Sequence, residues 1–122
     1  MLNTHLDHKG PQARLESVKL IVGKLKEMGG DTLTVFVTGD FNARPEHELF
    51  APLKAYMADT RTNTPETDLT GTTNGFGTEP EGKIIDYIFY RNANPLSYRV
   101  ITGNYGIPYI SDHYPILGTF DY

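Results

Sequence analysis

Apolar residues recur along the chain with two periods, which predict alternating strands and helices. Residues 2–6 read as a short strand, and residues 12–28 carry apolar side chains at steps of three and four, as an amphipathic helix does. Gly29 and Gly30 would end this helix, and a second strand is predicted at 33–38. The order strand, helix, strand predicts a crossover unit whose two strands lie in one sheet.

The second half of the chain predicts a strand at the centre of the sheet. Residues 83–91 place apolar side chains on both faces, which is typical of a strand covered on two sides. A short helix is expected over 46–56, interrupted near Pro52, and further strands are expected over 97–103 and 114–120. We therefore expect an α/β (α+β) sandwich, with a mixed β-sheet and helices on one face.

The segment between these elements predicts a long loop. Residues 58–83 are rich in Thr, Gly, Asn, Asp and Pro, and loops of this length in compact domains are frequently functional. Within the loop, residues 72–76 fit either a short strand or a tight turn. A second turn is expected at 92–95, where Asn and Pro alternate with other residues.

Composition narrows the function classes. A chain of 122 residues fits one domain, and an apolar fraction of 39% is that of a globular protein. No apolar run approaches the roughly 20 residues of a membrane span, and no signal peptide is visible, so the compartment is unknown. The absence of cysteine excludes thiol nucleophiles and cysteine–zinc sites. A net charge of -4 disfavours a general duplex-DNA binder, although a metal could supply positive charge for a phosphate substrate.

Polar side chains that could carry chemistry occur at four places, each at a strand end or in a strand close to a loop. They are His5 with Asp7 and His8, Asp40 with Asn42, Asp86 alone, and Asp112 with His113 after Ser111. Neighbouring strand ends in an α/β sheet can gather such groups into one cleft. Asp40, Asn42 and Asp112 offer oxygen donors that suit a hard cation such as Mg²⁺, and His113 can carry protons near neutral pH.

Each place also has an ordinary structural interpretation. Residues 39–43 are common turn residues, His5 could be a sheet histidine, and His8 lies in a loop that is expected to be solvated. Asp86 is harder to explain in this way, because a charge in an apolar strand needs a partner. The ring N–H of His113 could be that partner.

The four places occur in a familiar order. Asn-Thr-His-Leu-Asp, Gly-Asp-Phe-Asn, Ile-Asp-Tyr-Ile-Phe and Ser-Asp-His-Tyr-Pro-Ile follow one another, and Thr73–Phe76 adds a segment in the long loop. This order resembles the endonuclease/exonuclease/phosphatase superfamily, which includes deoxyribonuclease I and sphingomyelinase-like phosphodiesterases. The resemblance covers nearly all of the chain and implies half of the four-layer deoxyribonuclease-I-like fold.

The resemblance implies water attack on a phosphodiester or phosphomonoester, assisted by a divalent metal. The resemblance implies that His5 contacts the scissile phosphate and assists the leaving group. It also implies that Asp40 activates or orients the attacking water. Asn42 holds the phosphate or the metal. Asp86 and His113 form a proton-handling pair.

The resemblance also implies a site for Mg²⁺ or Mn²⁺. Asp112 matches a metal ligand of the family, and Asp40 and Asn42 would contribute to the same site. Asp7 and Arg44 match family positions whose roles are less defined.

Family members are roughly twice as long as this chain, which resembles only their C-terminal half. Their first half supplies an asparagine and the glutamate that is the principal metal ligand, and residues 1–122 contain no match to that segment. We therefore expect this chain alone to bind Mg²⁺ weakly and to turn over slowly or not at all. We also expect the inner sheet face, with one row of the strand 84–90, to be exposed and to form a homodimer.

Two other functions remain open. One is an inactive or binding-only half-domain, whose residues would look the same. The other is a zinc hydrolase using His5, Asp7 and His8, which resemble the zinc motif of metallo-β-lactamase-like enzymes with Asn3 in place of the first histidine. If the chain is a phosphoesterase, its negative net charge favours a small-molecule or lipid-like phosphate ester over long DNA as the substrate.

Overall fold

The computed structural model describes residues 1–6, 10–79, 81–103 and 111–122. Its elements, in chain order, are β1 (Leu2–His5), α1 (Pro11–Glu27), β2 (Val35–Asp40), the 3₁₀ turn η1 (Glu48–Phe50), α2 (Ala51–Lys54), β3 (Ala58–Asp59), α3 (Thr60–Asn63), the 3₁₀ turn η2 (Gly75–Gly77), β4 (Asp86–Arg91), β5 (Asn94–Val100) and β6 (Ile116–Asp121).

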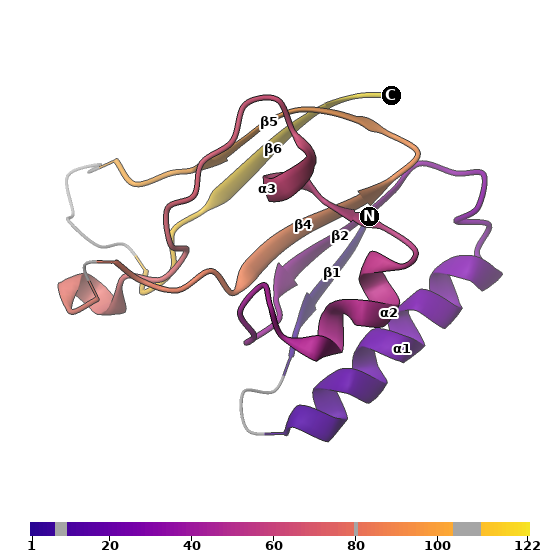
Figure 1. Ribbon diagram of the computed structural model, residues 1–122, viewed down its shortest axis with the longest axis horizontal. Helices are drawn as coiled ribbons and strands as arrows, with labels where there is room; N and C mark the ends of the chain where they lie inside the picture. The colour runs from indigo at the N-terminus through magenta and orange to yellow at the C-terminus, as the bar shows by residue number, and fades with distance from the viewer. Residues whose placement is uncertain (7–9, 80, 104–110) are drawn as a thin grey trace.

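The described strands form two sheets (Figure 1). The larger sheet has the order β1-β2-β4-β3, in which β1 and β2 are parallel and β4 is antiparallel to both of its neighbours. The predicted crossover β1–α1–β2, the central position of β4 and the mixed sheet are therefore confirmed. β5 and β6 pair antiparallel in a second, two-stranded sheet.

The hydrophobic core lies between the larger sheet and the helices α1 and α2, which cover one face (Figure 1). Val18 of α1, Val37 of β2 and Phe89 of β4 are completely buried there. Helical spacing directs the apolar stripe of α1 to this face, while strand alternation directs Val37 and Phe89 to it. This core holds the ends of β1, β2 and β4 in fixed register.

The opposite face of the larger sheet meets β6. Phe120 of β6 packs against Phe36, with 4.8 Å between ring centroids, and against Tyr90, at 5.5 Å. Ile88 is only 8% exposed, and Ile84 and Tyr90 are partly buried, so the expectation that this row of the strand is exposed is wrong. An open groove of about 800 Å³ nevertheless remains between this face and β6.

Several predicted boundaries are corrected by tertiary pairing. The segment expected to be a loop contains β3 and α3, because Ala58 and Asp59 pair with β4. Pro52 lies in the first turn of α2 rather than interrupting a helix, since a proline there loses no helical hydrogen bond. The expected turn at 92–95 is shorter, because β5 already begins at Asn94. No helix among the described residues is long and apolar enough to cross a membrane.

Candidate active site

Sheet register places three of the predicted side chains in one row. His5 ends β1 opposite Asp40 of β2, and Asp40 is opposite Asp86, the first residue of β4. The row lies at one end of the larger sheet, where β1 and β2 both stop. The gathering of strand-end groups that the sequence predicts is therefore present.

Gly39 allows β1 and β2 to approach closely at this row. Its φ is +141°, and a Cβ atom at this position would lie 1.8 Å from the carbonyl oxygen of Thr4. No side chain fits there, so only glycine permits this backbone contact. The glycine before Asp40 therefore brings β1, and with it His5, against the acid.

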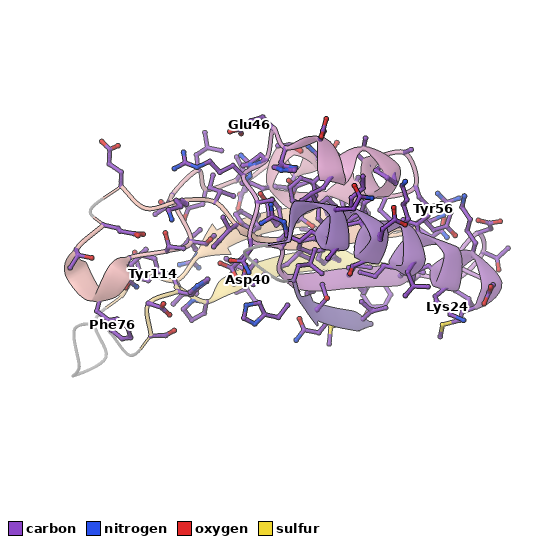
Figure 2. The ribbon with its side chains drawn as sticks, turned by 90° about the horizontal axis from the view of Figure 1, so that it is seen from below. Lys24, Asp40, Glu46, Tyr56, Phe76 and Tyr114 are labelled. Atoms are coloured by element: carbon purple, nitrogen blue, oxygen red, sulfur yellow. The ribbon has the colours of Figure 1, made fainter. Side chains whose placement is uncertain are left out.

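The side chain of Asp40 is labelled in Figure 2. Its two carboxylate oxygens have different partners. Oδ1 accepts the backbone N–H of Asn42 at 2.8 Å, which closes a tight turn. Oδ2 lies 3.3 Å from Nε2 of His5 and 3.8 Å from Nε2 of His113. The turn expected at this stretch is therefore present, and the same carboxylate directs its other oxygen toward two histidines.

Asn42 lies beside Asp40 on a backbone with a φ of 49°, beyond the end of β2. The side-chain amide of Asn42 donates to the backbone carbonyl of Leu6. The backbone carbonyl of Asn42 accepts a hydrogen bond from Nη1 of Arg14 at 2.8 Å. These contacts fix the turn to β1 and α1. Asparagine tolerates this left-handed conformation better than most residues.

Asp86 and His113 form the contact that the sequence predicts. Nδ1 of His113 lies 2.8 Å from Oδ2 of Asp86, and both side chains are largely buried. With the shared proton on Nδ1, the other ring nitrogen of His113 is directed toward Asp40.

Electrostatics shift both members of this pair. Burial raises the pKa of Asp86, and the charge of Asp40 adds to this, while hydrogen bonds from Thr72 and His113 offset part of the effect. Burial alone would lower the pKa of His113, but the hydrogen bond to Asp86 and the charges of Asp86, Asp40 and Asp112 outweigh it and raise that pKa. The imidazole therefore holds a proton more tightly than a free histidine does.

Sequence reasoning missed how the long loop supports these residues. The side-chain amide of Asn74 donates to the carbonyl of Ser111, and its backbone N–H donates to the carbonyl of Asp112 at 2.8 Å. The carbonyl of Thr72 accepts the N–H of Tyr114. Thr72, Thr73 and Asn74 are buried and polar, so they require partners, but the sequence shows only their residue types and not their burial.

The predicted catalytic residues and Asp112 line one open hollow of about 570 Å³. The residues that line it are Asn3, Thr4, His5, Gly39, Asp40, Asn42, Asp86, Asp112 and His113. Arg44 is exposed and does not line the hollow. Asp7 and His8, which the zinc alternative requires, lie outside the described residues.

The donor atoms in this hollow fit a divalent metal. Ligand atoms of Asp40, Asp86 and His113 all lie within 4.8 Å of one another. Asn42 and Asp112 line the same hollow and offer further oxygen atoms. A site rich in carboxylate oxygen suits Mg²⁺ or Mn²⁺.

The structure is an α/β fold whose strand ends bring acidic and histidine side chains together. Metal-dependent hydrolases use residues of these types. A family model described as the endonuclease/exonuclease/phosphatase family matches residues 7–113, and the chain belongs to this family. Proteins of this family are generally hydrolases of phosphate esters that depend on a divalent metal.

Solved structures show the same fold. A mannosyl-6-phosphatase from Bacteroides thetaiotaomicron VPI-5482 is similar at 31% identity and a TM-score of 0.84, over 98% of this chain and 50% of that one. A family member from Bacteroides vulgatus is similar at 28% identity and a TM-score of 0.86, over 96% and 47%. A 3′ phosphatase from Neisseria shares the fold at 19% identity and a TM-score of 0.70, over 93% and 56%.

The chain spans about half the length of the first of these relatives. No curated protein matches it.

Proposed function

We propose that this chain carries the proton-handling and metal-binding residues of a divalent-metal-dependent phosphoesterase. One observation supports this function most strongly. Oδ2 of Asp40 lies between Nε2 of His5 and Nε2 of His113, and Asp86 holds the opposite nitrogen of His113. A carboxylate beside two imidazoles can orient a water molecule so that the water gives a proton to one of the histidines.

The proposed roles follow from the contacts. Asp86 accepts the Nδ1–H of His113 and so keeps Nε2 free to accept a proton from the attacking water. Asp40 orients that water through Oδ2, because Oδ1 is committed to the turn. The side chain of His5 is 75% exposed, so it is available to contact a phosphate oxygen or the leaving group.

Asp40, Asn42 and Asp112 are the proposed metal ligands, with Asp86 close enough to contribute. When bound, the metal would act as a Lewis acid on the phosphoryl oxygens. The principal glutamate ligand of the family has no identified counterpart in residues 1–122. We therefore propose that the isolated chain binds Mg²⁺ or Mn²⁺ weakly and turns over slowly.

The proposed substrate is a small phosphate ester rather than long DNA. The net charge of -4 would repel a polyanion, whereas one phosphate group needs only local neutralisation by the metal. The similarity at 31% identity to a mannosyl-6-phosphatase supports a phosphomonoester.

Hydrolysis of p-nitrophenyl phosphate and bis-p-nitrophenyl phosphate tests the proposal, at high protein concentration and with Mg²⁺, Mn²⁺ or EDTA. We expect a metal-dependent rate that falls about 100-fold or more in His113→Ala, because the proton acceptor is removed. His47→Asn is the matched control. His47 lies outside the hollow, and its ring accepts the N–H of Leu49, a contact that asparagine can replace. An undiminished rate in His113→Ala would exclude the proposed role.

An alternative is that the chain is an inactive or binding-only half-domain. The observation that favours it is that the principal glutamate ligand of the family has no identified counterpart in residues 1–122. The same assay separates the two functions. A folded chain with neither metal-dependent turnover nor Mn²⁺ binding would support the alternative.

The open groove between the larger sheet and β6 is the proposed contact with a second copy of the chain. Apolar residues line it, including Phe36, Ile88 and Phe120, and Leu117 and Tyr122 remain exposed at its sides. An open groove lined mainly by apolar side chains offers a second copy a surface to bury. A homodimer would cover this groove in both copies.

A further inference from the structure

Thr72 is a completely buried polar residue that lies behind the candidate site. It is 0% exposed, although it belongs to a segment of loops and bends without a long helix or strand of its own. A buried hydroxyl must find hydrogen-bond partners within the protein. The partners of Thr72 are therefore informative.

The hydroxyl group of Thr72 lies at the point where β4 begins. It donates to the carbonyl of Lys83 at 3.1 Å and accepts the backbone N–H of Ile85 at 3.2 Å and of Asp86 at 3.3 Å. One oxygen atom thus contacts the backbone of three residues at the start of β4, Asp86 among them.

The main chain of Thr72 reaches the segment that carries His113. Its carbonyl accepts the N–H of Tyr114 at 2.8 Å, and the next residue, Thr73, forms an isolated β-bridge with His113. Thr72 therefore contacts both chain segments whose side chains meet at 2.8 Å in the Asp86–His113 pair.

We propose that Thr72 is a positioning residue whose hydroxyl group fixes the backbone at Asp86, and so gives the Asp86 carboxylate the orientation that receives the Nδ1–H of His113. The inference rests on the proposed function for its catalytic consequence, but the geometric claim concerns only the placement of Asp86 against His113. Thr72 touches neither substrate nor metal in this account. It acts through Asp86.

Three substitutions separate positioning from stability. Thr72→Val removes the hydroxyl and keeps the shape, while Thr72→Ser and Thr72→Ala differ from each other only by the hydroxyl oxygen. Thr60→Val is the control for loss of a buried hydroxyl. Thr60 is also 0% exposed and donates to the carbonyl of Ile88 at 2.7 Å, but it does not line the site hollow.

The first readout is the NMR resonance of the His113 Nδ1 proton in the 122-residue chain, at one fixed pH and without metal. We expect this hydrogen-bonded signal in the wild type, Thr72→Ser and Thr60→Val, and its loss or displacement in Thr72→Val and Thr72→Ala. The second readout is metal-dependent hydrolysis. Loss of a supporting hydrogen bond is expected to lower kcat about 10- to 100-fold in Thr72→Val and Thr72→Ala, with little change in KM, and Thr72→Ser should restore it.

Two results would overturn the inference. One is an unchanged His113 signal in both Thr72→Val and Thr72→Ala, and the other is an equal change in Thr60→Val. If Thr72→Val does not fold, the comparison of Thr72→Ser with Thr72→Ala decides the question. A chain without any hydrolytic activity would contradict the proposed function, while the NMR signal would still test the position of Asp86.

Discussion

The two faces of the larger sheet differ in how completely they are covered. On the helix side, Tyr87 and Phe89 of β4 pack with Phe41 and Phe50, and none of these rings is more than 1% exposed. On the other side, Phe36 and Tyr90 are only half-buried, beside an open groove. Strand alternation sends neighbouring residues of one strand into these two environments.

This difference separates the face that is closely packed from the face that the proposed homodimer would cover. The helix side is a closed aromatic core, and close packing of that kind carries most of the stability of a small domain. The groove side keeps an open surface lined mainly by apolar residues. The candidate site lies at the sheet end and depends on the closed side for its register, because Phe41 directly follows Asp40 and is completely buried in that core.

The largest effect is expected from a cavity in the closed face. Phe89→Ala should lower the free energy of unfolding by about 3–5 kcal/mol, because the ring is completely buried among other rings. Urea denaturation followed by circular dichroism measures this. Phe120→Ala on the groove side should cost clearly less, since Phe120 is only partly buried. Equal losses would show that the two faces are equally important for stability.

A smaller effect is expected at the site itself. Asp86→Asn should lower the pKa of His113, because the hydrogen bond and the negative charge that raise it are both weakened. An NMR titration of the metal-free protein measures this pKa. The raised pKa also predicts that His113 stabilises the fold below its unfolded pKa, about 6.5, and that this contribution is lost as pH rises through the folded pKa. A pKa that does not fall in Asp86→Asn would contradict the proposed pairing.

The smallest effect on stability is expected on the groove side. Leu117→Glu places a charge at a groove residue that is 49% exposed, so the free energy of unfolding should change by less than about 0.5 kcal/mol. Self-association, measured by analytical ultracentrifugation, should nevertheless be lost. Leu20→Glu on α1, at 63% exposure and away from the groove, is the matched control. A dimer that survives Leu117→Glu would place the contact elsewhere.

The sequence was sufficient to predict elements with a periodic apolar pattern and a buried charge that needs a partner. The helical period of α1 and the two apolar faces of β4 predicted the crossover and the central strand, and the lone charge of Asp86 predicted a contact with His113. The two-residue strand β3 was not predictable, because its conformation comes from pairing with Tyr90 and Phe89 rather than from local preference. The role proposed for Thr72 was not predictable for the same reason. The partners of its hydroxyl group are 11 to 14 positions away in the sequence.

The candidate site shows the same limit. The types of residue and their order indicated which side chains meet. They did not indicate that one oxygen of Asp40 closes a turn while the other lies near two histidines. That division depends on the register of three strands and on the backbone contact at Gly39.

Asp40→Asn provides the most direct test of the account, because asparagine keeps an oxygen that can accept the N–H of Asn42 while removing the charge that faces His5 and His113. The measurement is the rate of p-nitrophenyl phosphate hydrolysis with Mn²⁺, for wild type and variant at equal folded concentration. We predict a metal-dependent rate in the wild type that falls about 100-fold or more in Asp40→Asn. Equal rates in the two proteins would contradict the assignment of this hollow as the active site.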